Sequence, residues 1–148
     1  VALASSDKQP KLILESYSIR RYQASLYIVN EEELCLPEDS TLWLGEASLE
    51  LIQGRVAVDF SKVDPLIAKR HEVKCCFRQH LDTNLTCLPK GRNKARSIKK
   101  LLHEYQVPPW RRDQIVFVMV DQSLVEAIGL WHCQGEHLPL LNLSLISN

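Results

Sequence analysis

Two consecutive prolines, Pro108 and Pro109, set the strongest constraint on the fold of this 148-residue chain. Proline lacks the N–H that a helix interior needs, and it disfavours the helical conformation of the residue before it. In the preceding segment, 96–105, apolar residues recur at the i, i+3, i+4, i+7 spacing of one helical face: Ile98, Leu101, Leu102 and Tyr105. The sequence therefore predicts an amphipathic helix over 96–105 that ends before the prolines.

The polar side of this predicted helix is basic, and the cations continue into the segments on both sides of it. They come from the preceding loop, the helix and the following turn: Lys90, Arg92, Lys94, Arg96, Lys99, Lys100, Arg111 and Arg112. Because all three segments flank one short helix, their cations can converge on one surface. Such a surface suits phosphates, and A-form RNA is recognised largely through its backbone and 2′-hydroxyls. These eight residues are the predicted RNA-binding site, and a merely solvated basic face is the alternative.

The formal net charge of zero hides this concentration of cations. Residues 1–61 contain five Lys and Arg against ten Asp and Glu, whereas residues 62–112 contain thirteen against four. Residues 113–148 contain four acidic residues and no Lys or Arg. A charge block of this kind attracts polyanions whatever the net charge. We therefore expect an acidic, β-rich lead-in segment over 1–61 and a basic C-terminal domain over 62–148.

Short runs rich in Ile, Val, Leu and Tyr indicate many short strands around the single helix. The predicted strands are 11–15, 17–29, 41–44, 48–52, 55–60, 72–77, 85–88, 115–120 and 124–131, followed by an alternating run of Leu141, Leu143 and Leu145. This pattern predicts an α+β fold of mostly antiparallel short strands, with one principal amphipathic basic helix packed on a sheet. No run of 18 apolar residues exists, so we expect no membrane span and a cytoplasmic protein.

The cysteines are odd in number and irregular in spacing: Cys35, Cys75, Cys76, Cys87 and Cys133. This pattern fits neither a zinc knuckle nor an ordinary disulfide framework. We therefore expect all five to be buried free thiols in a reducing cytosol.

Trp110 allows two interpretations because it lies between two prolines and a predicted strand. It could stack on an exposed base, or it could anchor the hydrophobic core. Tryptophan in such a position is more often a core residue, so the core interpretation is favoured.

The sequence lacks a recognisable catalytic or metal-binding set. It contains neither the phosphate-cradling G-x-x-x-x-G-K loop nor a G-x-S-x-G elbow, and its five histidines show no ligand spacing. We therefore expect the chain to carry no catalytic residue, no metal site and no cofactor of its own. A self-sufficient enzyme with an unrecognised site is the rival hypothesis.

The segment 90–131 resembles the C-terminal domain of bacterial tRNA(Ile)-lysidine synthases. The resemblance covers roughly a third of the chain and lies in Gly91-Arg92, Ile98-Lys99-Lys100-Leu101-Leu102, Val107-Pro108-Pro109-Trp110, Arg112-Asp113, Ile115 and Ala127-Ile128-Gly129-Leu130-Trp131. A weaker similarity runs from Arg20-Arg21-Tyr22 to Leu26-Tyr27. The chain departs from the family pattern at Arg111, where leucine is usual, and at Val116, where proline is usual.

The resemblance implies that this chain binds tRNA(Ile) on its acceptor-stem side. The full enzyme of the family uses ATP with Mg²⁺ to activate the wobble cytidine of that tRNA, and L-lysine then displaces AMP to give lysidine. The serine-glycine-glycine loop that grips ATP in the family is missing here, so we expect the catalytic domain to be absent from this chain. A protein-interaction module whose basic face binds an acidic partner, even the acidic segment Glu31 to Asp39, is the alternative. Both a monomer and a homodimer stay open.

Overall fold

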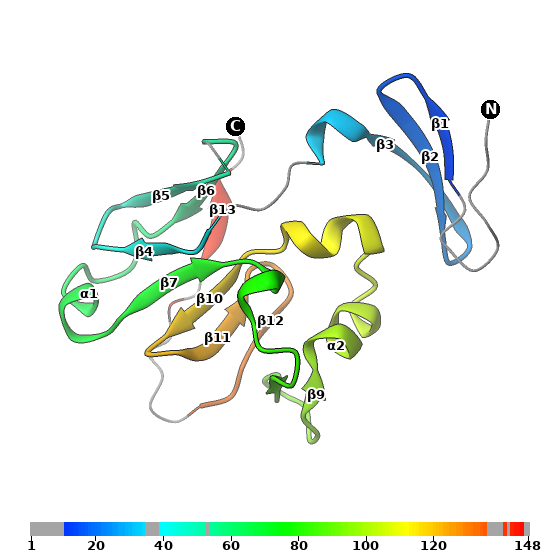
Figure 1. Ribbon diagram of the computed structural model, residues 1–148. Coiled ribbons are helices and arrows are strands. Elements are labelled where there is room, and N and C mark those ends of the chain that lie inside the picture. The colour runs from blue at the N-terminus through cyan, green and yellow to red at the C-terminus, as the bar shows by residue number, and fades with distance from the viewer. Residues whose placement is uncertain (1–10, 35–38, 53, 136–140, 142, 147–148) are drawn as a thin grey trace. The chain divides into compact units, whose positions relative to one another are not determined.

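The computed structural model describes residues 11–34, 39–52, 54–135, 141 and 143–146 (Figure 1). The chain divides into two compact units, Val1–Cys35 and Leu36–Asn148. The first contains β1–β3 with the short 3₁₀ helix η1, and the second contains every other element. Most strands pair antiparallel in several small sheets, and helices are few. None of the described helices is long and apolar enough to cross a membrane.

The first unit is a three-stranded antiparallel meander. Its elements are β1 (Lys11–Leu14), β2 (Tyr17–Tyr22), β3 (Ser25–Asn30) and η1 (Glu31–Glu33). The predicted strand 17–29 is divided because Gln23 adopts a positive φ of 55° and turns the chain. The Glu31 carboxylate binds Lys11 and Arg20 of the same unit, at 3.2 and 2.6 Å. Glu31 is therefore ion-paired within its own unit.

The second unit is built on a five-stranded antiparallel sheet of order β12-β11-β10-β7-β4. The strands are β4 (Thr41–Trp43), β7 (Val73–Cys76), β10 (Phe117–Val120), β11 (Ser123–Ala127) and β12 (Trp131–His132). A tight turn joins β10 to β11, because Asp121 and Gln122 both have positive φ. Gly129, with φ of 81°, lies in the turn that ends β11 and breaks the predicted strand 124–131 in two.

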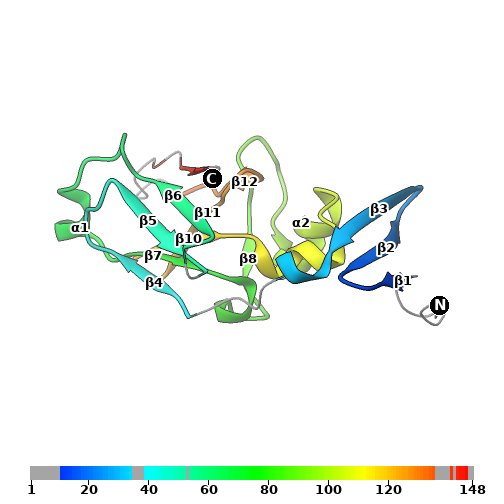
Figure 2. The same ribbon diagram turned by 90° about the horizontal axis from the view of Figure 1, so that it is seen from above.

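Two smaller sheets complete the second unit. In one, β6 (Val56–Asp59) lies between β5 (Ser48–Leu51) and β13 (Ser144–Ile146), and Figure 2 shows β5 and β6 side by side. In the other, β8 (Thr86–Cys87) pairs with β9 (Arg96–Ser97). The helices are α1 (Ile67–Arg70), α2 (Ile98–Glu104) and the 3₁₀ helices η2 (Arg78–His80) and η3 (Pro109–Gln114).

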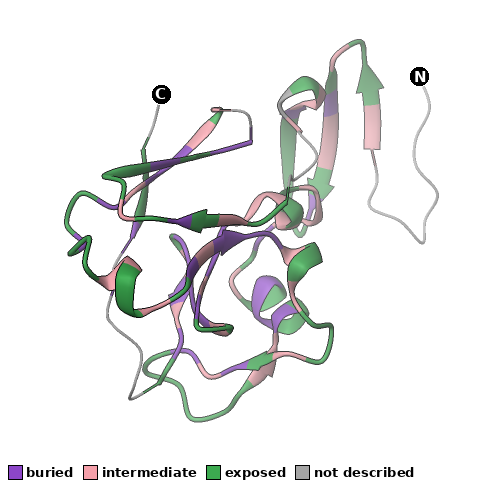
Figure 3. Ribbon diagram, turned by 60° about the vertical axis from the view of Figure 1, so that its left-hand side comes forward, coloured by how far each residue is buried: buried purple, intermediate pink, exposed green. Residues whose placement is uncertain are grey.

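The core that supports the basic segment lies between α2 and the five-stranded sheet. Ile98, Leu101 and Leu102 of α2 are buried in one cluster with Phe117 and Trp131. The Trp131 ring lies 6.2 Å from the Phe117 ring and 5.2 Å from that of Tyr105, which packs half-buried against the cluster. The apolar spacing thus identified the buried residues of the helix correctly (Figure 3).

The helix itself is shorter than the predicted segment 96–105. Arg96 and Ser97 form strand β9, because they pair with Cys87 and Thr86 of β8. The side chain of Ser97 then accepts a hydrogen bond from the backbone N–H of Lys100 at 3.2 Å, as an N-cap serine does. Gln106, with φ of 58°, ends the helix before the prolines are reached.

The boundary that charge predicts at residue 61 lies inside the second unit of the structure. β4 pairs with β7, and the β5–β6 hairpin belongs to this unit although both precede residue 61. The compact units divide between residues 35 and 36. The division at residue 61 is therefore a division of charge. The separate roles that it predicts for an acidic lead-in segment and a basic domain stay a prediction.

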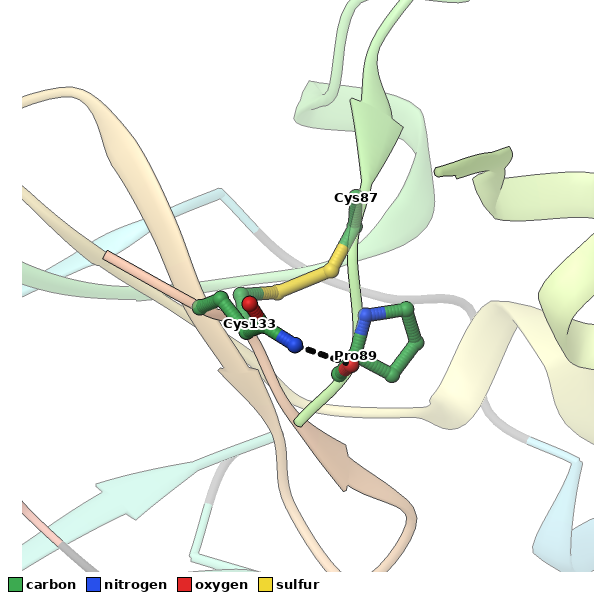
Figure 4. Close-up of a disulfide and its surroundings, with 4 residues drawn as sticks. Cys87, Pro89 and Cys133 are labelled. Carbon is green, nitrogen blue, oxygen red and sulfur yellow. Dashed lines mark hydrogen bonds between the residues drawn. A yellow bond between two sulfur atoms is a disulfide. The ribbon is translucent and has the colours of Figure 1, made fainter. Parts of the chain in front are cut away.

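The expectation of five free thiols is wrong for one pair, because Cys87 and Cys133 form a disulfide with Cα atoms 6.0 Å apart (Figure 4). The two residues are 46 positions apart in sequence, so spacing could not reveal the pair. They meet because Pro89, just after β8, forms a β-bridge with Cys133, just after β12. Cys75 and Cys76 are buried free thiols as predicted, and burial raises the pKa of Cys75 to about 12. Cys35 lies outside the described residues.

Glu126 in β11 is a buried carboxyl group, only 1% exposed. Its Oε1 accepts a hydrogen bond from the backbone N–H of Leu143 at 3.3 Å. Its Oε2 lies 3.3 Å from Nε2 of His132, the cross-strand partner of Glu126 in β12, although that ring nitrogen makes no hydrogen bond with the described residues. Burial raises the pKa of the Glu126 carboxyl to about 7, against the lowering effect of the Leu143 hydrogen bond.

This raised pKa predicts that stability falls as pH rises. The folded protein favours the protonated carboxyl, so the stabilisation is complete below the ordinary pKa of 4.5 and is lost as pH passes 7. Between pH 5 and pH 8 we expect the free energy of unfolding to fall by about 2–3 kcal/mol through Glu126. Glu126→Gln should remove this part of the pH dependence. Urea unfolding of both proteins at the two pH values measures it, and parallel pH profiles would contradict the prediction.

Candidate nucleic-acid interface

The eight predicted cations come from four consecutive parts of the second unit. Lys90, Arg92 and Lys94 lie in the loop after β8, Arg96 in β9, Lys99 and Lys100 in α2, and Arg111 and Arg112 in η3. All are exposed except Arg96 and Arg112, which are half-buried. The packing of α2 explains the position of its cations. Because Ile98, Leu101 and Leu102 are buried, the intervening Lys99 and Lys100 face solvent.

Two of the cations share one carboxylate within the protein. Arg92 and Arg96 both bind the carboxylate of Glu104, the last residue of α2, Arg96 through its Nε at 3.4 Å. The guanidinium of Arg92 also lies over the Tyr105 ring, 4.9 Å from its centre. The hydrogen bond from Arg92 is the main cause that holds the pKa of Glu104 below its ordinary value and raises that of Arg92. These two arginines therefore fasten the loop and β9 to the end of α2.

The cations of η3 also serve the fold in part. The Nε–H of Arg112 donates to the backbone carbonyl of Val107 at 2.9 Å, which fixes the guanidinium beside the end of α2. Arg78 of η2 binds the Asp113 carboxylate at 2.6 Å and joins the two 3₁₀ helices. The terminal nitrogens of Arg112 form no hydrogen bond or ion pair with the described residues, so they can contact an anion.

The remaining five cations are Lys90, Lys94, Lys99, Lys100 and Arg111. Within the described residues, these side chains form no ion pair and no hydrogen bond. Charges of this kind, exposed and not opposed by a carboxylate, are free to neutralise phosphates.

Three of the predicted residues meet around one hollow on the surface. It has a volume of about 400 Å³, and its lining consists of Ser97, Lys99, Lys100, His103, Glu104 and Arg112. Lys90, Lys94 and Arg111 do not line it. The prediction omitted Ser97 and His103, although His103 follows Lys99 by four residues and therefore shares its side of the helix.

Trp110 is half-buried in η3, and it is not a member of the buried cluster beside α2. The choice between a core role and a stacking role for Trp110 therefore stays a prediction. Trp131, at the start of β12, occupies the core, because the sheet carries its ring to Tyr105 and Phe117.

The segment that contains the eight predicted cations matches a known protein family. The family model described as the TilS substrate C-terminal domain matches residues 73–141. The chain is 30% identical over 145 residues to a tRNA(Ile)-lysidine synthase of Serratia proteamaculans, covering 94% of this chain and 31% of that protein. It is 36% identical over 126 residues to a tRNA(Ile)-lysidine synthase of Vibrio cholerae, covering 84% and 28%. The chain thus spans about a third of the length of the curated relatives it matches.

Proposed function

Because residues 73–141 belong to the TilS substrate C-terminal domain family, we propose that this chain is the tRNA-binding portion of a tRNA(Ile)-lysidine synthase. In this proposal the basic, solvent-facing side of α2 and its flanking loops contact the phosphate backbone of tRNA(Ile), and the chain itself performs no chemistry. ATP, Mg²⁺ and L-lysine act in a catalytic part that corresponds to the remaining two thirds of the relatives' length. The protein works in the cytoplasm, where its tRNA is found.

The observation that carries the proposal is the set of exposed cations that no carboxylate opposes. Lys99 and Lys100 stand on the same short helix, and the core fixes that helix through Leu101 and Leu102. Each phosphate that such a cation neutralises releases counterions, so affinity depends steeply on salt. A rigid basic helix beside a basic loop is suited to the regular phosphates of A-form RNA.

The first test is the salt dependence of tRNA binding by the Lys99→Ala/Lys100→Ala variant. On duplex nucleic acid, log affinity falls with log salt with a slope of about −0.9 per phosphate contact. We expect the variant to flatten the slope by roughly two units at most and to weaken binding to many RNAs alike. Folding should persist, because both side chains are exposed and alanine favours helices. Filter binding at several salt concentrations measures the slope.

Lys62→Ala/Lys69→Ala provides the matched control, since it also removes two exposed lysines but lies outside the interface. We expect this control to retain the affinity and slope of the unmodified chain. If the two variants had the same affinity and salt dependence, the basic surface would be only a solvated face and not an RNA interface. Retention of an acidic protein in place of tRNA, with the same salt dependence, would instead support a protein-interaction module.

A further inference from the structure

The hollow beside α2 differs from the rest of the basic surface because it gathers cations from two elements around a concave space. Lys99 and Lys100 enter from α2, and Arg112 enters from η3. The imidazole of His103 and the hydroxyl of Ser97 complete the polar lining. Three fixed positive charges therefore surround one hollow, with Glu104 as its single carboxylate.

The effect of that carboxylate is already largely cancelled. Glu104 accepts hydrogen bonds from Arg92 and Arg96, which approach it from the loop and from β9. Neither arginine lines the hollow. The charges of Lys99, Lys100 and Arg112 are thus left without an acidic partner. The hollow therefore carries a net positive charge and favours an anionic ligand.

The anchoring of Arg112 prepares the hollow for an anion with several acceptor oxygens, such as a phosphate. Its Nε–H is held by the Val107 carbonyl, so the guanidinium is oriented before any ligand arrives. A guanidinium held in this way binds phosphate oxygens with less loss of side-chain freedom than a lysine does. The volume of about 400 Å³ falls within the roughly 300–1,000 Å³ of small-ligand sites, which leaves room for a nucleotide as well as its phosphate.

We propose that this hollow binds the terminal 5′-phosphorylated nucleotide of an RNA. An internal phosphodiester carries one negative charge and two ester links, so it passes over a convex surface more readily than it enters a concave one. A terminal phosphate monoester carries a charge of about −1.5 to −2 near neutral pH and is attached through a single ester bond. It therefore meets both the charge and the shape of the hollow. The inference rests on the proposed RNA-binding function and adds to it a binding site that is specific for the 5′ end of an RNA.

The test compares one hairpin RNA in two forms, with a 5′-phosphate and with a 5′-hydroxyl, by fluorescence anisotropy on the 148-residue chain. A few charge-assisted hydrogen bonds to a phosphate are worth about tenfold in affinity. We expect the phosphorylated hairpin to bind about tenfold more tightly. In Lys99→Ala/Lys100→Ala this ratio should fall toward one.

The matched variant Lys90→Ala/Lys94→Ala removes two exposed cations of the interface that do not line the hollow. It should weaken both hairpins alike and keep their ratio. Equal binding of the two hairpins by the unmodified chain would overturn the inference and leave general RNA binding intact. Failure to bind either hairpin would overturn the proposed function together with the inference. Inorganic phosphate at the same concentration as the hairpin provides a further control. If it displaced the phosphorylated hairpin, the hollow would be a site for the free anion, and the assignment to an RNA end would be overturned.

Discussion

Trp131→Ala is expected to lower the free energy of unfolding by about 3–5 kcal/mol, the cost of removing a large buried aromatic side chain. Trp131 is 5% exposed, and its ring lies against Tyr105 from the end of α2 and Phe117 from β10. Its loss leaves a cavity between the helix and the sheet, where both elements are already fixed by other contacts. Urea unfolding followed by circular dichroism measures the change.

Two further variants make this prediction specific. Trp131→Phe keeps an aromatic ring and removes an indole N–H that has no hydrogen-bond partner in the described part of the chain, so it should cost clearly less. Trp110→Ala removes a half-buried ring outside the cluster and should also cost less than Trp131→Ala. If the two alanine variants lose equal stability, the assignment of Trp131 as the central core residue is wrong.

Reduction of the Cys87–Cys133 disulfide is expected to destabilise the protein by about 3–4 kcal/mol. The disulfide closes a loop between residues 46 positions apart, and a cross-link over such a length removes considerable entropy from the unfolded chain. Thermal unfolding with and without a reductant measures the difference. Cys87→Ser/Cys133→Ser should behave like the reduced protein and should not respond to reductant.

Cys75→Ser is the control for general effects of the reductant, because Cys75 is a buried free thiol. This variant should still lose stability when the disulfide is reduced. A melting temperature of the unmodified chain that is the same with and without reductant would contradict a contribution of the disulfide to stability.

Local patterns predicted those features that depend on neighbours in sequence. The spacing of Ile98, Leu101 and Leu102 identified the buried side of α2, because side chains three and four residues apart share a helical face. Alternation located most strands of the second unit, although their ends moved where positive φ angles at Gly129 and Gln106 changed the chain direction. The resemblance to lysidine synthases likewise rested on a contiguous motif, and it is confirmed by the match to residues 73–141.

Features that depend on distant residues were not predictable in this way. The predicted helix 96–105 included Ser97, but this residue pairs with β8 as part of β9 and caps α2. Arg92 and Glu104 meet because the loop after β8 folds back on the end of α2, and no local rule connects them. The predicted site therefore treated eight cations as equivalent. Within the described residues, the structure distinguishes two that Glu104 binds from six that no acidic group opposes, one of which, Arg112, is held by a backbone carbonyl.

The Cys87–Cys133 disulfide also encloses the predicted interface in a covalently closed loop. All eight predicted cations lie between the two cysteines in sequence, so the bond and the backbone together make the basic segment a closed ring. A protease that cuts the exposed stretch from Lys90 to Lys94 therefore releases nothing. The two pieces stay joined through sulfur and separate only when a reductant is added, so a nicked chain still migrates as one molecule under non-reducing denaturing conditions.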